Sequence, residues 1–188
     1  MNLIGTKTLE TDRLILRRLT IDDAESAYKN WCSSDIVSRY VLWEKHKNVE
    51  ETKELFKMWE EDYNNLDTFR WIVEIKDTKE VIGTIDVCNK KFLKFSTCEI
   101  GYCYGEAFWN KGYATEALKR VLKFLFEEVG LESIYAYHAS NNPASGKVMK
   151  KSGMTYEGTL RSRIIDKEGL RNDLISYSMI KEDYFNRK

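Results

Sequence analysis

Residues 98–115 read Cys-Glu-Ile-Gly-Tyr-Cys-Tyr-Gly-Glu-Ala-Phe-Trp-Asn-Lys-Gly-Tyr-Ala-Thr. The pattern predicts a short apolar strand that runs through a glycine-containing turn into a long helix. The first N–H groups of a helix have no partner inside it, and the helix dipole adds positive potential there. Such a turn is therefore suited to bind phosphate. Glycine before a helix is also typical of a plain turn, so this stretch alone leaves both interpretations open.

The turn differs from two well-known nucleotide-binding motifs. No Gly-Lys-Ser/Thr follows it, as a P-loop would require. Gly105 and Gly112 are too far apart for the G-x-G-x-x-G fingerprint of dinucleotide-binding folds.

Composition limits the class of protein. A chain of 188 residues predicts one domain, residues 1–188, with a sizeable core. The 30 basic residues balance 30 acidic ones, which argues against a nucleic-acid partner because such a surface needs a basic stripe. No apolar run reaches membrane-spanning length and the first residues lack a signal-peptide pattern, so we expect a cytoplasmic protein without membrane contact.

The cysteines predict neither a metal site nor a disulfide framework. Cys32, Cys88, Cys98 and Cys103 have no metal-type spacing. We therefore expect reduced thiols in the core, as in most cytosolic proteins.

Upstream of the turn, the pattern predicts one strand, three helical stretches and a β-meander. Residues 13–19 read as a strand, Thr20 as an N-cap with Asp23 three residues on, followed by helix to about residue 31 and a short helical stretch over 34–43. Asn48, with Glu51 at N3, caps another helix, whose apolar stripe is Leu55, Phe56, Trp59 and Tyr63. We assign that stripe to the core, although part of the region is also suited to line a substrate groove. Alternating residues then predict strands over 69–75, 81–87 and 96–104.

Downstream, helices and strands alternate. A helix over 112–129 ends at Gly130, a strand follows over 133–138, and Asn142-Pro143 begins a helix that ends at Gly153. Two strands, about 154–165 and 170–180, join through the turn 166–169. The order β-α-α-β-β-β-α-β-α-β-β predicts an α/β (α+β) domain with a mixed sheet.

Several short motifs in this order resemble one family. They are Glu10-Thr11-Asp12-Arg13-Leu14-Ile15-Leu16-Arg17, Glu99-Ile100-Gly101-Tyr102, Trp109-Asn110-Lys111-Gly112-Tyr113-Ala114-Thr115-Glu116-Ala117, Asn142-Pro143-Ala144-Ser145, Lys151-Ser152-Gly153-Met154 with Glu157-Gly158, and Arg171-Asn172-Asp173 near Tyr177. Each is weak alone, but their order and spacing resemble the GNAT superfamily of acetyl-CoA-dependent N-acetyltransferases over nearly the whole chain. The narrower resemblance is to the branch that contains the ribosomal-protein-alanine N-acetyltransferases.

The resemblance implies that acetyl-CoA is the cosubstrate and that its pyrophosphate lies on the 110–115 turn. The implied contacts are Trp109, Asn110, Lys111, Gly112, Tyr113, Ala114 and Thr115. Gly112 lets the backbone approach the phosphates and Ala114 is too small to block them. The branch usually has Gly where Asn110 stands, but Asn tolerates the left-handed conformation better than most residues.

The resemblance also implies a mostly antiparallel sheet flanked by helices and splayed between its fourth and fifth strands, 96–104 and 133–138. The pantetheine arm would pair with strand backbone there, like an added strand. Tyr102, Cys103 and Tyr104 would contribute backbone groups, and core packing explains two of the three side chains.

Acyl transfer needs a donor for the leaving thiolate. Asn142 and Ser145 are the best placed candidates, at the N-cap and N3 positions of one helix; an N-cap role alone explains Asn142 equally well. By resemblance the branch places a serine at 145 as donor to the thiol. Many superfamily members use a tyrosine at the position of Met149, which cannot donate.

The general base has two candidates, Glu99 and His138. Glu99 lies on the strand beside the expected cofactor channel, and a structural carboxylate is the competing interpretation. His138 ends the opposite strand; histidine is a residue type that serves as a base near neutral pH, but a surface residue is the competing interpretation. One ribosomal-protein subgroup uses a glutamate where Ile164 stands here. Glu157 and Asp173 are the remaining nearby carboxylates, and both have plausible structural roles.

The class of acceptor is inferred from the absence of a glutamate at position 164. An α-amino group has a pKa of about 7.7–8.0 and lysine about 10.4, which favours an N-terminus where no strong base is present. We therefore expect acetylation of a protein or peptide N-terminus, by a monomer or homodimer. One alternative is an acetyltransferase of small-molecule amines such as a polyamine, an aminoglycoside or an amino-acid-like compound. Polycationic substrates favour an acidic cleft, which Glu44, Glu60, Glu61 and Asp62 would supply, although a solvated helix face explains these residues as well. The other alternative is a CoA-binding protein without turnover.

Overall fold

The computed structural model describes residues 1–41 and 43–186. Packing divides the chain into two compact units. The N-terminal unit contains Leu3–Asp86 and Tyr102–Arg120, and the C-terminal unit contains Met1–Asn2, Val87–Gly101 and Val121–Lys188. Strands β4 (Val81–Asn89) and β5 (Thr97–Tyr104) and helix α4 (Tyr113–Phe124) each contribute residues to both units, so neither unit is a separate stretch of chain.

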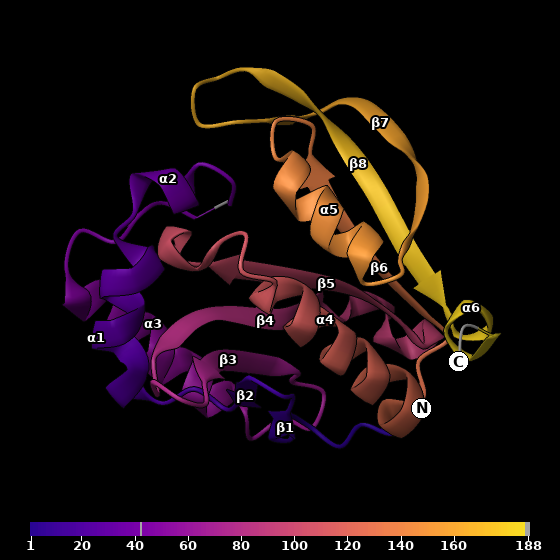
Figure 1. Ribbon diagram of the computed structural model, residues 1–188, viewed down its shortest axis with the longest axis horizontal. Helices are drawn as coiled ribbons and strands as arrows, with labels where there is room; N and C mark the ends of the chain where they lie inside the picture. The colour runs from indigo at the N-terminus through magenta and orange to yellow at the C-terminus, as the bar shows by residue number, and fades with distance from the viewer. Residues whose placement is uncertain (42, 187–188) are drawn as a thin grey trace. The chain divides into compact units, whose positions relative to one another are not determined.

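Eight strands form one sheet in the order β1-β2-β3-β4-β5-β6-β8-β7 (Figure 1). Their bounds are β1 Leu9–Glu10, β2 Leu14–Arg17, β3 Arg70–Ile75, β4 Val81–Asn89, β5 Thr97–Tyr104, β6 Ser133–Ala139, β7 Thr155–Ile165 and β8 Arg171–Ile180. The pairs β1–β2, β2–β3, β3–β4, β6–β8 and β7–β8 are antiparallel, and β5–β6 is parallel. The mixed, mostly antiparallel sheet confirms the predicted fold class.

The N-terminal unit packs its helices around an aromatic cluster. Its helical segments are the 3₁₀ turn Ile21–Asp23, α1 Ala24–Ala27, the π-helical turn Tyr28–Cys32, α2 Asp35–Ser38, α3 Val49–Asp62, the 3₁₀ turn Glu106–Phe108 and the start of α4 Tyr113–Phe124. The buried side chains of Trp31, Phe56 and Tyr63 form the centre of this core. Two of the three, Phe56 and Tyr63, belong to the predicted stripe of α3, while Trp59 is partly buried against the same cluster.

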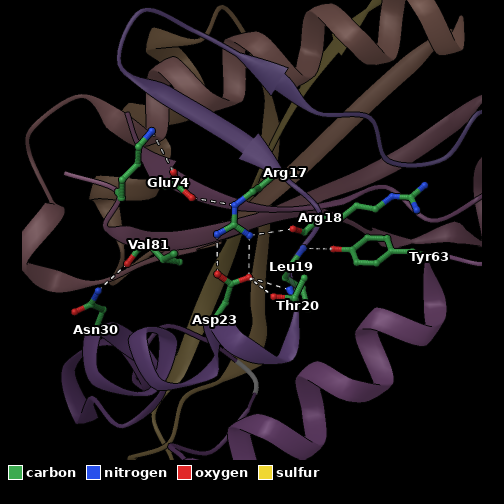
Figure 2. Close-up of polar contacts among 10 residues, drawn as sticks. Arg17, Arg18, Leu19, Thr20, Asp23, Asn30, Tyr63, Glu74 and Val81 are labelled. Carbon is green, nitrogen blue, oxygen red and sulfur yellow. Dashed lines mark hydrogen bonds and ion pairs between the residues drawn. The ribbon is translucent and has the colours of Figure 1, made fainter. Parts of the chain in front are cut away.

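An ion-pair network ties the beginning of this unit to its sheet. Figure 2 shows Arg17 between Asp23 and Glu74. Its Nη2 donates to Asp23 Oδ1 at 2.7 Å and its Nε to Glu74 Oε2 at 2.9 Å. The hydrogen bonds that Arg17 donates to Asp23 raise the pKa of Arg17, so the guanidinium stays charged. Asp23 also accepts the Thr20 N–H at 2.8 Å, as the predicted capping interaction requires. One side chain thus joins β2, the first helical turn and β3.

The C-terminal unit packs α5, Pro143–Lys151, against β6 and β8 (Figure 1). It also contains the 3₁₀ turn Lys90–Phe95, the π-helical turn Leu125–Val129 and α6 Lys181–Asn186. Along β6, Ile134, Ala136 and His138 are buried while the residues between them are partly exposed. His138 lies against Gly146 of α5, so this alternate set faces the helix.

Strand β7 is the outer strand of this unit and is irregular. It pairs with β8 from Thr155↔Ser178 to Ile165↔Arg171, but the register shifts between Leu160 and Ile164. Ser162 has a left-handed backbone there, with φ of 55°. Most β7 side chains are exposed.

Most predicted elements are confirmed, including the Asn48 and Asn142 caps and the left-handed Gly130. The structure adds β1, α6 and two 3₁₀ turns to the prediction. The expected helix over 34–43 is shorter, since α2 ends at Ser38, and residue 42 of that range lies outside the described residues. Among the described helices none is long and apolar enough to cross a membrane.

One expectation about cysteines is wrong. None of the four is in a disulfide, and Cys32 and Cys98 are buried, but Cys88, near the end of β4, is exposed. Burial raises the pKa of Cys32 and of Cys98 to about 12, so both thiols are protonated at neutral pH.

Candidate functional site

The turn before α4 has an unusual backbone. Asn110 has φ of 60° and Gly112 has φ of 84°, so two left-handed residues flank Lys111. All three residues are exposed. Successive N–H groups in such alternating conformations form concave anion sites. The left-handed Asn110 agrees with the prediction that asparagine replaces glycine here.

Helix α4 begins directly after this turn. The first helical hydrogen bond runs from Glu116 N to Gly112 O at 3.0 Å. The N–H groups of Tyr113, Ala114 and Thr115 therefore precede the helical ladder and have no acceptor within it. These groups, with the positive end of the helix dipole, suit a phosphate or pyrophosphate.

Trp109 attaches the turn to the end of β5. Its indole Nε1 donates to Tyr104 O at 2.8 Å, and its ring packs against the aromatic core of the N-terminal unit. Tyr40 contacts the same ring edge-on, with centroids 6.3 Å apart. The structure thus brings the predicted turn residues together with Tyr104.

The three β5 residues predicted to contact the pantetheine arm pack their side chains against other residues of the N-terminal unit. Tyr104 is buried, and Cys103 packs against the aromatic cluster of the N-terminal unit. The centroids of the Tyr102 and Tyr104 rings are 6.3 Å apart. Burial raises the pKa of the Tyr104 phenol. The surroundings fit the prediction that these residues act through their backbone.

In the C-terminal unit, Asn142 and Ser145 occupy the predicted helix positions. Asn142 Oδ1 accepts the Ser145 N–H at 3.4 Å and Pro143 is the first residue of α5. The loop before the cap is fixed to β8, because Ser140 N donates to Asp173 O at 2.9 Å and Asp173 N to Ser140 Oγ at 3.2 Å. This leaves Ser145 half-buried in the first turn of the helix.

His138 is buried by the same helix. Its Nδ1 donates a hydrogen bond to Ala139 O at 2.9 Å. A Cβ at Gly146 would lie 2.4 Å from Nε2, so only glycine fits beside the ring. Tyr177 of β8 contacts the other side at 5.9 Å. These contacts favour packing as the role of His138.

Glu99 lies in a different environment. It pairs in the β5–β6 ladder with Tyr135, whose ring contacts Phe92 and Tyr137. Burial raises the pKa of Glu99, against a hydrogen bond from Asn89 that lowers it. Burial and the negative Glu99 raise the pKa of Tyr135 to about 12. A partly buried carboxylate with a raised pKa is suited to accept a proton near neutral pH.

The ladder that contains Glu99 is short. It runs from Thr97↔Ser133 to Glu99↔Tyr135, and β6 continues for four residues beyond Tyr135 to Ala139. Glu99 and Tyr135 are thus the last paired residues of these two parallel strands, which the resemblance expects to separate.

Sequence reasoning assigned no role to a group of three residues beside the turn. Thr11 and Arg13 both donate hydrogen bonds to Glu116, and Arg13 Nη1 also donates to Lys111 O at 3.1 Å. Arg13 and Glu116 are separated by 103 residues, so no local pattern links them. Within residues 1–41 and 43–186 no group of three metal-ligating side chains is found.

Comparison with known proteins finds a matching domain family and relatives that cover most of this chain. The acetyltransferase (GNAT) domain family matches residues 13–155. An uncharacterised N-acetyltransferase of Bacillus subtilis, YoaA, is 35% identical over 173 residues, which cover 92% of this chain and 96% of the relative.

Solved structures share the fold. A GNAT-family acetyltransferase from Bacillus anthracis superposes with a TM-score of 0.80 at 27% identity, covering 94% of this chain and 99% of that one. The microcin C7 self-immunity acetyltransferase MccE, solved in complex with acetyl-CoA and AMP, has a TM-score of 0.78 at 20% identity and covers 90% and 93%.

Proposed function

The chain belongs to the GNAT family of N-acetyltransferases, and from that membership we propose that it transfers the acetyl group of acetyl-CoA to the N-terminal α-amine of a protein or peptide. The observation that carries the proposal is the exposed turn with left-handed Asn110 and Gly112 before α4, which suits the pyrophosphate of the cosubstrate. Free thiols support a cytoplasmic location.

The residues present fit acetyl-CoA. Gly112 and the first N–H groups of α4 form the cradle for the pyrophosphate, with Trp109, Lys111, Ala114 and Thr115 around it. The backbone of Tyr102–Tyr104 would pair with the pantetheine arm. Asn142 would orient Ser145 by capping α5.

The reaction needs a neutral amine as nucleophile, an acceptor for the amine proton and a hydrogen-bond donor for the leaving thiolate. The neutral amine attacks the thioester carbon, so a C–N bond forms and the C–S bond breaks. Glu99 would take the proton released by the amine, directly or through water. The Ser145 hydroxyl would donate its hydrogen bond to the departing thiolate.

The acceptor is argued from chemistry. Ile164 stands where one ribosomal-protein subgroup has its glutamate, so Glu99 is the remaining candidate with a raised pKa. A weakly basic site favours an α-amine over lysine, because the difference of about 2.5 pKa units is about 3.5 kcal/mol of deprotonation cost. The [ribosomal protein uS5]-alanine N-acetyltransferase of Escherichia coli is 27% identical over 89 residues, 47% of this chain and 46% of that protein.

An acceptor screen tests the proposal. The protein is incubated with acetyl-CoA and two pools, one of peptides with ribosomal-protein N-termini and one of polyamines, aminoglycosides and amino acids, and products are identified by mass spectrometry. One added acetyl group on a peptide α-amine supports the proposal. Acetylation of small amines alone, or of lysine faster than the N-terminus in a matched peptide, contradicts it.

Ser145→Ala should lower kcat by about 100-fold at saturating substrate, because the leaving thiolate loses its donor. KM for acetyl-CoA should change little, since the backbone cap remains. Steady-state kinetics measures both, with Lys147→Ala on the exposed side of α5 as the control. Full turnover by Ser145→Ala would remove the serine from the mechanism.

The pH profile reports on Glu99. Only its carboxylate form accepts a proton, so kcat/KM should fall as pH falls through its pKa. Because burial raises that pKa, the decline should begin above the ordinary range of glutamate. Glu99→Gln should lower kcat/KM by about 100-fold and abolish this limb. Glu157→Gln, which alters a carboxylate paired with Ser178, is the control. An unchanged acid limb in Glu99→Gln would refute the assignment.

A further inference from the structure

Arg13 joins the segment before β2 to the turn before α4. Its Nε donates to Glu116 Oε2 at 2.7 Å, its Nη2 lies 2.6 Å from the same oxygen, and its Nη1 donates to Lys111 O at 3.1 Å. The guanidinium also lies over the Tyr113 ring, 4.5 Å from its centroid. The Arg13 side chain therefore contacts Lys111 of the turn, Tyr113 at the start of α4 and Glu116 in the first turn of that helix.

Glu116 holds this arginine in place. Its Oε1 accepts the Thr11 hydroxyl at 2.6 Å and the Arg13 N–H at 3.0 Å. Burial opposes ionisation, but the hydrogen bonds from Thr11 and Arg13 outweigh it and lower the pKa of Glu116. The carboxylate is thus ionised at neutral pH, and two side-chain nitrogens of Arg13 face it in a fork that lysine cannot reproduce.

The contact with Lys111 O controls the direction of one peptide group. In a planar trans peptide the C=O and the following N–H point in opposite directions. Because the carbonyl of Lys111 is bonded to Arg13, the N–H of Gly112 points away from the guanidinium. Gly112 is left-handed and lacks a side chain, so its own backbone does little to prevent rotation of this peptide group.

The positive charge of Arg13 has a second effect on anion binding at the turn, because it compensates the negative charge of Glu116. A carboxylate in the first turn of a helix stabilises the helix but repels an anion bound at its end. Arg13 neutralises Glu116, and without it the negative charge would face a bound phosphate uncompensated.

We propose that Arg13 is a positioning residue that holds the Lys111–Gly112 peptide group in its anion-binding orientation and neutralises Glu116, so that it sets the affinity for the pyrophosphate of the acetyl donor. This inference rests on the proposed use of acetyl-CoA. It predicts an effect confined to donors that carry the pyrophosphate.

The test compares two donors. Acetyl-CoA contains the pyrophosphate, and S-acetylpantetheine lacks it but presents the same thioester. Arg13→Gln should weaken acetyl-CoA binding by about 10- to 100-fold, the effect of losing a charge-assisted hydrogen bond. Its kcat/KM with S-acetylpantetheine should stay within about twofold of wild type, which a general structural defect would not allow.

Two further variants separate charge from geometry. Arg13→Lys keeps the positive charge and loses the fork, so it should also weaken acetyl-CoA binding, by less than Arg13→Gln. Lys119→Ala, an exposed change in the same helix, should alter neither donor. Calorimetry gives the affinities and thermal unfolding checks the fold.

Three outcomes would overturn the inference. Equal losses with both donors would assign Arg13 a general structural role. Unchanged acetyl-CoA affinity in Arg13→Gln, with wild type binding normally, would show that Arg13 does not set this affinity. Failure of the wild-type protein to bind acetyl-CoA would overturn the proposed function together with this inference.

Discussion

Gly112→Trp should abolish acetyl-CoA binding and leave a folded protein. A Cβ at this position would lie 3.3 Å from Arg13 Nη2, and the indole beyond it would occupy the space that the phosphates need. The left-handed backbone, with φ of 84°, adds about 1–2 kcal/mol of strain for any residue with a Cβ. We expect affinity measured by calorimetry to fall at least about 100-fold.

A matched control separates strain from obstruction. Gly169, in the β7–β8 turn, has a similar φ of 78° and no atom within 4 Å of its Cβ position. Gly169→Trp therefore introduces comparable strain and bulk away from the site, and acetyl-CoA affinity should persist. Unchanged affinity in Gly112→Trp would contradict the placement of the pyrophosphate.

Gly83→Ala should destabilise the fold by about 3 kcal/mol, at the upper end of the cost of overpacking. Its Cβ would lie 2.2 Å from Cys103 O and 2.9 Å from Tyr104 Cα, which are backbone atoms of β5 and cannot rotate away. Relief requires β5 to move over the residues assigned to the pantetheine arm. Acetyl-CoA affinity should therefore fall along with the free energy of unfolding.

Chemical denaturation measures this loss of stability. Gly158→Ala changes another strand glycine, in β7, where the Cβ would meet no atom within 4 Å. Its destabilisation should be smaller and come from its backbone strain alone, because φ is 157°. A free energy of unfolding for Gly83→Ala equal to that of wild type would show that β5 adapts without cost.

The sequence predicts helix ends well where the signal is local. Asn48 and Asn142 cap their helices through a side-chain oxygen that reaches three residues along the chain, so their partners can be read from adjacent positions. The left-handed C-cap Gly130 follows from the same short-range reasoning. The π-helical turns after α1 and α4 were not predicted, because the spacing of apolar residues does not distinguish them from α-helix.

Contacts between distant residues were not predictable. Arg17 meets Glu74 across 57 positions and Arg13 meets Glu116 across 103, and nothing near either arginine names its partner. The environment of His138 depends in the same way on Gly146 of a later helix. Sequence therefore predicted where the turn before α4 and the first turn of α5 lie, but not the distant side chains that contact them.

The irregular outer strand has a consequence for how copies of the protein behave in concentrated solution. A regular exposed edge of a sheet is a template on which a second chain can add a strand and start a fibre. In β7 the shifted register and left-handed Ser162 interrupt that template, and exposed Arg161 and Arg163 flank the interruption with like charges. The edge of β7 is therefore a poor template on which a second copy of the chain could add a strand.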